Sequence, residues 1–311
     1  MLWSGHGEEI SGEVQLVGDQ GIWGDSVVWR KAAVVRDGAC VAYLHLRNHY
    51  GAAPQPLPAG SDLTVPHVVI GRDDADALIA ELRRGPVEAT VSVRVSRPSQ
   101  SVGQNVVVRV PAAGTEWDET QPSVLVCAHY DTFFNTLGAY DNGSGTIELL
   151  HLLRGWNDQG PARQILGVFF TAEEWHLGGA QEFVRARSAE ELDRISMVVN
   201  IDGIGRGNAL ELFTAPETFE AHARRQAERL LGHRFSITSR FPSTKGTDDA
   251  IFAMRGIPAF FLTINDQERL HTPLDVLDPE IAANAGQLEA LIRVIAEETP
   301  VPDRFPAAAP L

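Results

Sequence analysis

The strongest constraint on the fold of this chain is a regular alternation of short apolar runs and longer amphipathic stretches, which begins near residue 103. The predicted strands are residues 105–110, 123–128, 164–170, 196–202 and 259–264. The predicted helices are residues 144–156, 178–188, 216–232, 247–256 and 279–298. Strands that alternate with helices favour an α/β fold, in which a mixed, mostly parallel sheet is flanked by helices.

The first hundred residues have a different pattern. Short strand-like runs, separated by Gly and Pro clusters, fall at residues 13–17, 26–29, 31–36, 40–46, 67–70 and 89–95. A single helix is predicted at residues 73–85, where an acidic start and a final glycine mark its two ends. We therefore predict two domains, a small β-rich one over residues 1–100 and an α/β one over residues 101–311.

Composition excludes several classes of protein. A net charge of -15 opposes binding to nucleic acid, which needs a clustered excess of Lys and Arg. The two cysteines, Cys40 and Cys127, make no disulfide framework. No apolar stretch reaches the roughly 18 residues of a membrane span, and the first residues lack the pattern of a signal peptide. The expectation is a cytoplasmic protein without a membrane partner, or a secreted one if an upstream segment is missing.

Ionisable residues follow the predicted strands of the α/β region, at the points where the apolar runs end. Carboxyl ends of parallel strands share one edge of a sheet, so we expect these side chains to converge. They are His129, Asp131, Glu173, Glu174, Asp202 and His271, and the Gly-rich turn after residue 138 adds Asp141. So many charges at one edge would repel one another unless divalent cations bound there. Nitrogen and carboxylate ligands without thiolates favour zinc over manganese or cobalt.

The motifs AHYDT, GAYDNGSG, FFTAEEWHLGGAQEFV, VNIDGIG and HTPLD occur in this order between residues 103 and 298. In these motifs the chain resembles the co-catalytic zinc exopeptidases, a family that includes bacterial leucine aminopeptidases, glutamate carboxypeptidase and the transferrin receptor. The segments KAAVVRDGACVAYLHL, TVPHVVI and DDADALIAEL are similar to the protease-associated domain found in such enzymes. That similarity implies that residues 1–100 form a β-rich lid without a catalytic group.

The resemblance implies a role for each ionisable residue and a reaction. It assigns one metal ion to His129 and Asp202 and the other to Glu174 and His271, with Asp141 bridging both. Asp131 is implied to orient the ring of His129, and Glu173 to act as general base. The implied activity is that of a metallo-exopeptidase, most simply an aminopeptidase, in which a water activated by two zinc ions hydrolyses a peptide or small amide.

The sequence departs from the family pattern at two places, Leu270 and the segment that contains Asp248. Leu270 stands where many members have a tyrosine that steadies the oxyanion, so either the metals suffice, or Tyr130, Tyr140 or another donor replaces it. Asp248, in a segment that is often Ser-Asp-His, either lines the substrate pocket or caps a helix.

A glutaminyl cyclase and a non-catalytic binding scaffold are the alternatives to an exopeptidase. The sequence HLGGAQEF favours a peptidase over the cyclase, and the complete ligand set argues against the scaffold.

Two further histidines lie in the first domain. His45 and His49 fall in a strand-and-turn segment, where four residues span roughly 13 Å, too far to share an ion. We therefore predict that they are ordinary surface or turn residues.

Overall fold

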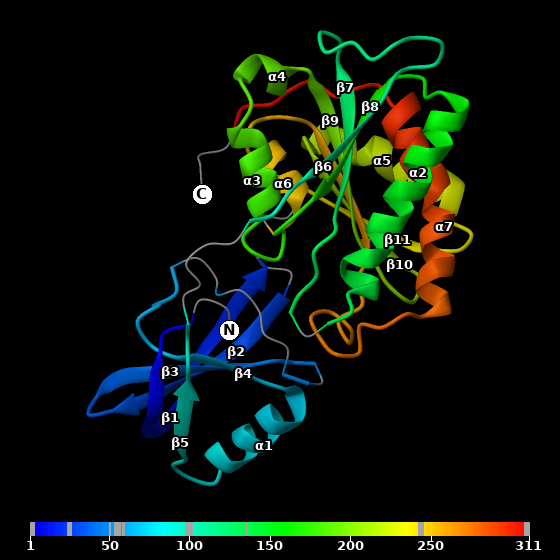
Figure 1. The fold of residues 1–311 in the computed structure, drawn as a ribbon. Helices are drawn as coiled ribbons and strands as arrows, with labels where there is room; N and C mark the ends of the chain where they lie inside the picture. Colours follow the sequence, from blue (N-terminus) through cyan, green and yellow to red (C-terminus); the bar gives the residue numbers. More distant parts are fainter. Residues whose placement is uncertain are drawn as a thin grey trace. The chain divides into compact units, whose positions relative to one another are not determined.

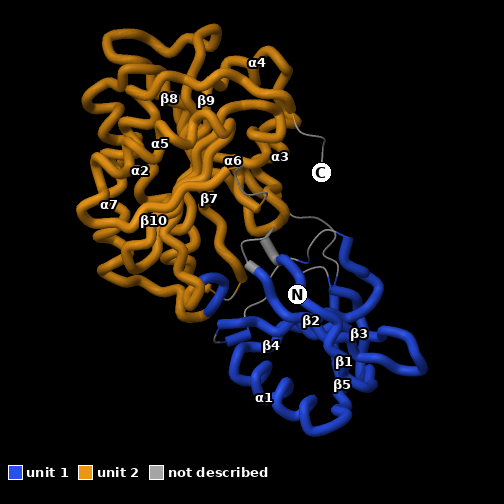
Figure 2. Tube along the Cα trace, turned by 180° about the vertical axis from the view of Figure 1, so that it is seen from behind, with its two compact units in different colours: residues 1–101, 270–272 blue, residues 102–269, 273–311 orange. Residues whose placement is uncertain are grey.

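The computed structural model describes residues 4–23, 27–49, 51–52, 57, 60–96, 102–134, 136–241 and 246–307. The chain divides into two compact units (Figure 2). Unit 1 consists of residues 1–101 and 270–272, and unit 2 of residues 102–269 and 273–311.

Unit 1 is a five-stranded sheet in the order β4-β3-β2-β1-β5 with one helix. Its elements are β1 (Gly7–Trp23), β2 (Val27–Arg36), β3 (Ala39–Leu46), β4 (His67–Ile70), α1 (Arg72–Leu82) and β5 (Glu88–Val93). Neighbouring strands are antiparallel except β3 and β4. The strands predicted at residues 26–29 and 31–36 belong to one continuous strand, Val27–Arg36, in which Arg30 pairs across the ladder with Asp19.

Unit 2 is built on a seven-stranded sheet in the order β11-β10-β12-β9-β7-β8-β6. The strands are β6 (Val106–Val110), β7 (Ser123–His129), β8 (Gln164–Phe170), β9 (Ile195–Ile204), β10 (Ala209–Ala215), β11 (Ser236–Arg240) and β12 (Ala259–Ile264). Only the pairs β10–β12 and β6–β8 are antiparallel. Together with the helices on its faces, this sheet confirms the predicted α/β class with a mixed, mostly parallel sheet.

Helices cover both faces of this sheet (Figure 1). On one face lie α2 (Gly145–Gln159), α5 (Glu217–Leu231) and α7 (Pro279–Arg293), which share a core with Val124, Val126 and Val199. On the other face, α3 (Gly178–Arg185) and α6 (Asp248–Ala253) pack on Leu125 and Cys127. Alternate residues of β7 thus serve opposite cores, which explains why its apolar run is uninterrupted.

Several elements differ from the sequence prediction. Strands β10 and β11 were not predicted, since β10 contains Glu211 and β11 is an edge strand with a polar alternation. The helix predicted at residues 178–188 ends at Arg185, and a separate helix α4 (Ala189–Asp193) begins with a capping box between Ser188 and Glu191. The last predicted helix is α7 followed by a π-helical turn, η2 (Val294–Glu298).

Candidate metal centre

The parallel strands β7, β8 and β9 deliver the predicted side chains to one edge of the sheet. His129 is the last residue of β7, Asp202 lies near the end of β9, and Glu173 and Glu174 follow β8 after a short turn. β7 and β8 are buried along their whole length, so the ionisable side chains lie at their carboxyl ends.

His129, Glu173 and Asp202 form the first group of potential metal ligands, with ligand atoms within 4.8 Å of one another. His129 is 1% exposed, and its Nε2 lies 3.1 Å from Asp202 Oδ1 and 3.9 Å from Glu173 Oε2. The carboxylate of Asp202 is therefore the closer partner of this imidazole nitrogen.

Asp141, Glu174 and His271 form the second group, under the same 4.8 Å limit. Asp141 also approaches the first group, because its Oδ1 lies 3.1 Å from His129 Nε2. A carboxylate within reach of both groups has the position that a bridging ligand requires. In the part of the chain that the structure describes, no third group of this kind occurs.

The turn that carries Asp141 is held against β9. It lies in η1 (Ala139–Ser144), directly before α2, and the Asp141–Asn142 peptide bond is cis. The side chain of Asn142 donates to the Ile201 carbonyl at 2.9 Å and accepts the Gly203 N–H at 3.2 Å, so it bonds on both sides of Asp202. A Cβ at Gly145 would lie 2.3 Å from the Ile201 oxygen, so only glycine allows α2 to start this close to the strand.

Asp131 makes contacts that differ from the implied ones. The Nδ1 of His129 lies 3.0 Å from the backbone oxygen of Asp131 and 3.6 Å from its carboxylate Oδ1. The carboxylate instead accepts the backbone N–H groups of Glu173, at 3.0 Å, and Glu174, at 3.3 Å. Asp131 thus orients the ring through its main chain and holds the glutamate pair through its side chain.

The electrostatics of the site fit a divalent cation. Burial raises the pKa of Glu173 well above its usual range, and the neighbouring Asp202 and Glu174 raise it further. Burial opposes a charge on His129, yet Asp202 and Glu173 raise the pKa of that imidazole well above its ordinary value. Negative charge is therefore in excess at this edge, and hard oxygen and imidazole donors are the groups that zinc accepts.

The structure also describes Leu270 and Asp248, where the sequence departs from the family pattern, and the two tyrosines that could replace the missing one. The Tyr140 hydroxyl accepts the Asp266 N–H at 3.2 Å, and the Tyr130 hydroxyl donates to the Gln104 carbonyl at 2.6 Å. Leu270 is 8% exposed. Asp248 makes no side-chain cap and is fully buried, and its carboxylate has no hydrogen-bond partner among the described residues. Residues 242–245, which precede it, lie outside the described part of the chain.

Asp275, a residue of the HTPLD motif, was given no role by the sequence prediction. It is 1% exposed and accepts the backbone N–H groups of Tyr140 and Asp141. The signal in the sequence was an Asp four residues after His271. It does not reveal the partners of this side chain, which are main-chain groups more than 130 positions away.

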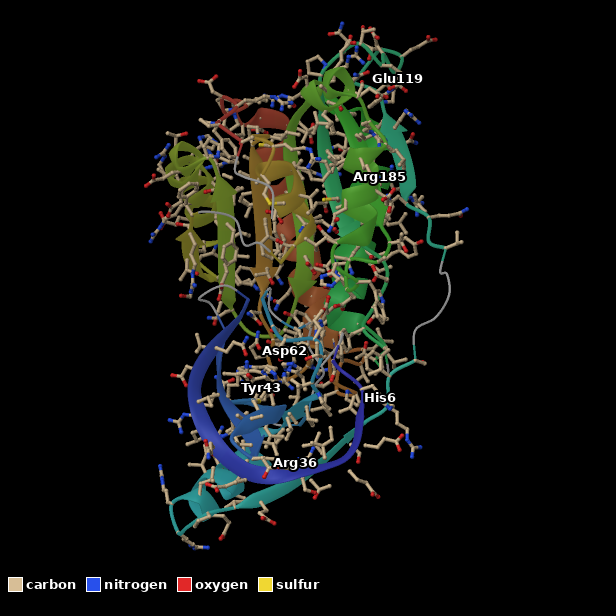
Figure 3. The ribbon with its side chains drawn as sticks, turned by 90° about the vertical axis from the view of Figure 1, so that its left-hand side faces the viewer. His6, Arg36, Tyr43, Asp62, Glu119 and Arg185 are labelled. Atoms are coloured by element: carbon tan, nitrogen blue, oxygen red, sulfur yellow. The ribbon has the colours of Figure 1, made fainter. Side chains whose placement is uncertain are left out.

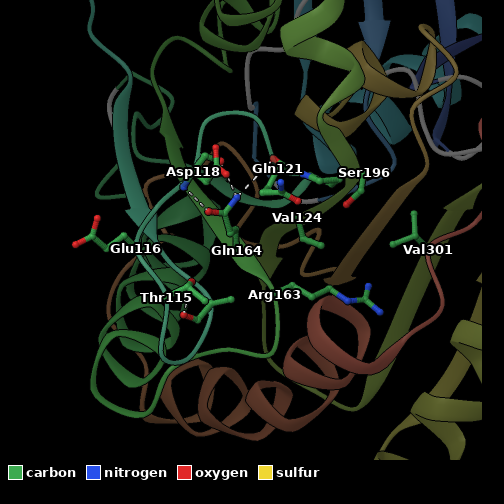
Figure 4. A pocket seen from close by; sticks show the side chains of 11 residues that line it. Thr115, Glu116, Asp118, Gln121, Val124, Arg163, Gln164, Ser196 and Val301 are labelled. Carbon is green, nitrogen blue, oxygen red and sulfur yellow. Dashed lines mark hydrogen bonds between the residues drawn. The ribbon is translucent and has the colours of Figure 1, made fainter.

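A pocket of about 600 Å³ lies elsewhere in unit 2 (Figure 4). Val124, Gln164 and Ser196 line it, and these residues lie at the amino ends of β7, β8 and β9. Asp118 and Gln164 are joined there by hydrogen bonds of 2.7 and 3.0 Å. Since the potential ligands gather at the opposite ends of the same strands, this pocket is separate from the candidate metal centre.

The fold and the two ligand groups define a class of α/β proteins that gather His, Asp and Glu side chains at the carboxyl edge of a mixed sheet. Within this class, residues 105–297 match Peptidase family M28, and the chain belongs to that family. The resemblance to co-catalytic zinc exopeptidases is thereby confirmed.

Relatives and solved structures agree with this membership. Aminopeptidase YwaD of Bacillus subtilis is 27% identical over 233 residues, which are 72% of this chain and 49% of that protein. A vacuolar membrane protease of Kluyveromyces lactis is 28% identical over 56% of this chain and 19% of its own length. The chain thus spans about half or less of these two relatives.

Two solved structures share the fold. A Peptidase M28 precursor from Shewanella amazonensis has a TM-score of 0.66 and 22% identity, and covers 87% of this chain and 63% of that one. BSAP, a zinc aminopeptidase from Bacillus subtilis, has a TM-score of 0.61 and 22% identity, over 86% of this chain and 67% of that one.

The expectation of a cytoplasmic protein is wrong. Several of the matching relatives are named vacuolar membrane proteases, among them those of Kluyveromyces lactis and Yarrowia lipolytica. Among the described residues, no helix combines the length and the apolar character that crossing a bilayer requires.

Proposed function

We propose that this chain is an aminopeptidase that uses two divalent ions, most simply zinc. The observation that carries the proposal is the position of Asp141, whose Oδ1 lies 3.1 Å from His129 Nε2 while its carboxylate also groups with Glu174 and His271. Membership of Peptidase family M28 supports the same function.

In this proposal each potential ligand is assigned to one of the two ions or to both. His129 and Asp202 would hold one ion, Glu174 and His271 would hold the other, and Asp141 would be shared by both. When bound, the two ions polarise the scissile carbonyl and lower the pKa of the attacking water. Asp131 keeps the glutamate pair in place through the N–H groups of Glu173 and Glu174.

Glu173 moves the proton. It lies near His129 without a hydrogen bond to it, at 3.9 Å, and it is 9% exposed. Its carboxylate accepts a proton from the attacking water and delivers it to the leaving amine as the C–N bond breaks. Burial raises the pKa of Glu173, and bound cations oppose this shift, so the group can both take up and release the proton.

A comparison of substrates tests the proposal. Metal-free protein is reconstituted with zinc and assayed against a set of peptide amides with a free amino terminus and the same set N-acetylated. We expect turnover of the free amines alone, with two zinc ions per chain. Turnover of the acetylated set alone would contradict an aminopeptidase, and ammonia released from an N-terminal glutaminyl peptide without hydrolysis would indicate a cyclase.

We also propose that residues 1–100 form a separate domain of the protease-associated type without a catalytic group. Residues 1–101 fall into one compact unit, which supports this, and none of the residues described up to position 96 belongs to a potential ligand group. Full-length protein with His67→Gln is expected to keep both ions and its turnover number. Loss of an ion from this variant would contradict the assignment.

A further inference from the structure

The segment that follows β12 closes on itself around one guanidinium group. Arg269 Nη1 donates to the carbonyls of Leu274, at 2.8 Å, and Val276, at 3.0 Å. Its Nη2 donates to Asp278 Oδ2 at 2.7 Å. Residues 269–278 therefore form a loop, here called the Arg269 loop, whose shape is set by charge-assisted hydrogen bonds.

One carboxylate joins this loop to the turn that carries Asp141. Asp275 Oδ1 accepts the N–H of Tyr140 at 2.6 Å, and Oδ2 accepts the N–H of Asp141 at 3.1 Å. All three residues are buried, so these bonds are shielded from water. The two oxygens of a single side chain thus fix two successive peptide units, and the second of these belongs to Asp141.

We infer that Asp275 is a positioning residue that holds Asp141 in the bridging orientation and couples it to the loop on which His271 lies. The inference rests on the proposed function for the bridging role of Asp141. Both hydrogen bonds of the Asp275 carboxylate go to main-chain N–H groups and not to a potential ligand atom. It acts by fixing where the Asp141 carboxylate can lie.

The geometry of a bridge explains why this matters. A bridging carboxylate must offer one oxygen to each of two ions that lie about 3.5–4 Å apart. Rotation of the Asp141 peptide would move both oxygens together and weaken both ions at once. Partners beyond the ligands typically change metal affinity by about 10–100-fold when they are substituted.

The test uses full-length protein with Asp275→Asn. The amide keeps one acceptor oxygen but turns an NH₂ group toward an N–H donor, so one of the two bonds is lost. Zinc affinity is measured by competition with a chromophoric chelator, and kcat and KM are measured after zinc loading. We expect both zinc affinities to fall about 10–100-fold, and kcat to fall with little change in KM.

A matched control separates positioning from stability. Glu297 is a carboxylate of the same unit that accepts the Trp156 Nε1–H at 2.6 Å and the Ala162 N–H at 3.0 Å, and it belongs to neither ligand group. Glu297→Gln should lower the melting temperature but leave zinc affinity unchanged. If Asp275→Asn fails to fold, Arg269→Gln loosens the same loop and should reduce zinc affinity in the same direction.

The outcomes separate this inference from the proposed function. Wild-type zinc affinity and kcat in folded Asp275→Asn, or unchanged zinc affinity in Arg269→Gln, would overturn the positioning role while the aminopeptidase proposal stands. A wild-type chain that binds two zinc ions but hydrolyses no peptide would overturn the proposed function. In that case, weakened zinc binding in Asp275→Asn would still support the role of Asp275.

Discussion

Asp131 and Glu173 are joined by a hydrogen bond of 3.0 Å from the backbone N–H of Glu173 to the carboxylate of Asp131. The same carboxylate accepts the next N–H, that of Glu174. The turn between these residues and β8 also contains Ala172 at a positive φ of 53°, a conformation that needs support from its surroundings. Asp131 therefore holds the backbone of two adjacent glutamates, Glu173 and Glu174, which have different proposed roles.

The first prediction concerns Asp131→Asn. The amide retains one acceptor for two N–H donors, so the glutamate pair should shift and kcat should fall about 10–100-fold, with weaker zinc binding. Steady-state kinetics and chelator competition measure both effects. Asp118→Asn is the control, since Asp118 accepts the Thr120 N–H at 2.8 Å away from the ligand groups and should affect neither quantity. Wild-type values for Asp131→Asn would contradict the prediction.

The second prediction separates the two glutamates. Glu173→Gln cannot take the proton of the attacking water, so kcat should fall about 10²–10⁴-fold while KM and both ions are retained. Glu174→Ala removes a proposed ligand, so one ion should be lost. Metal stoichiometry and both kinetic constants are measured for each variant. Because Glu173 also lies in the group with His129 and Asp202, loss of an ion from Glu173→Gln would reassign it as a ligand.

Unit 1 contains a buried, hydrogen-bonded pair of histidines, His45 and His67. His67 Nε2 lies 2.7 Å from the Asp62 carbonyl, which can only accept, and His67 Nδ1 lies 2.9 Å from His45 Nε2. The proton on His45 must then sit on Nε2, and its Nδ1 has no hydrogen-bond partner among the described residues. Tyr43, whose ring lies 5.0 Å from that of His67, and Asp62 are labelled in Figure 3.

The third prediction is that unit 1 loosens in acid. Burial lowers the pKa of His45 to about 3, and the nearby His67 and Lys31 add to the effect. The unfolded chain, with an ordinary histidine pKa near 6.5, binds more protons below that pH, so stability falls from about pH 6.5 downward and levels off near pH 3. At pH 5 the loss should be about 2 kcal/mol.

Hydrogen exchange of the full-length protein measures this loss. Peptides that cover β3 and β4 should exchange faster at pH 5 than at pH 7.5 after correction for the intrinsic rate, and His45→Gln should reduce the difference. His151→Gln is the control, because the His151 side chain is 64% exposed. Equal protection at both pH values in the wild-type protein would contradict the prediction.

The fourth prediction concerns removal of the metal. Without cations, the carboxylates of the candidate metal centre repel one another, and binding of zinc to the folded state alone should stabilise it. At a free zinc concentration of about 100 times Kd the gain is about 2.7 kcal/mol for each bound ion, or roughly 5–10 °C in Tm per ion. Calorimetry of chelated and zinc-loaded protein measures the shift. Identical transitions, with zinc bound in one sample, would contradict the expected coupling.

Much of the fold could be predicted because buried strands have an unmistakable pattern. The bounds of β8 and β12 agree with the apolar runs at residues 164–170 and 259–264, since both faces of each strand are covered. β11 has half-buried residues alternating with exposed ones at the edge of the sheet, so its sequence SITSR has no apolar run to detect.

The candidate site could be predicted less completely. Residues such as His129 were found because strand ends converge, which is a rule of topology. The prediction that His45 is an ordinary surface or turn residue was wrong. The register of β3 with β4 brings His67, 22 positions away, beside its ring, and no local pattern records that pairing. Asp275 binds main-chain N–H groups of distant residues. Such a contact cannot be predicted from the sequence, because it does not depend on the type of the residue that donates the N–H.

Saturation mutagenesis should distinguish the two ends of these side-chain to main-chain hydrogen bonds. Asp131 and Asp275 bind the N–H groups of positions 173, 174, 140 and 141, and every residue except proline supplies an N–H. Each bond therefore restricts its two ends unequally. The two aspartates should tolerate almost no substitution, whereas Tyr140, as far as this bond is concerned, can be replaced by any residue other than proline.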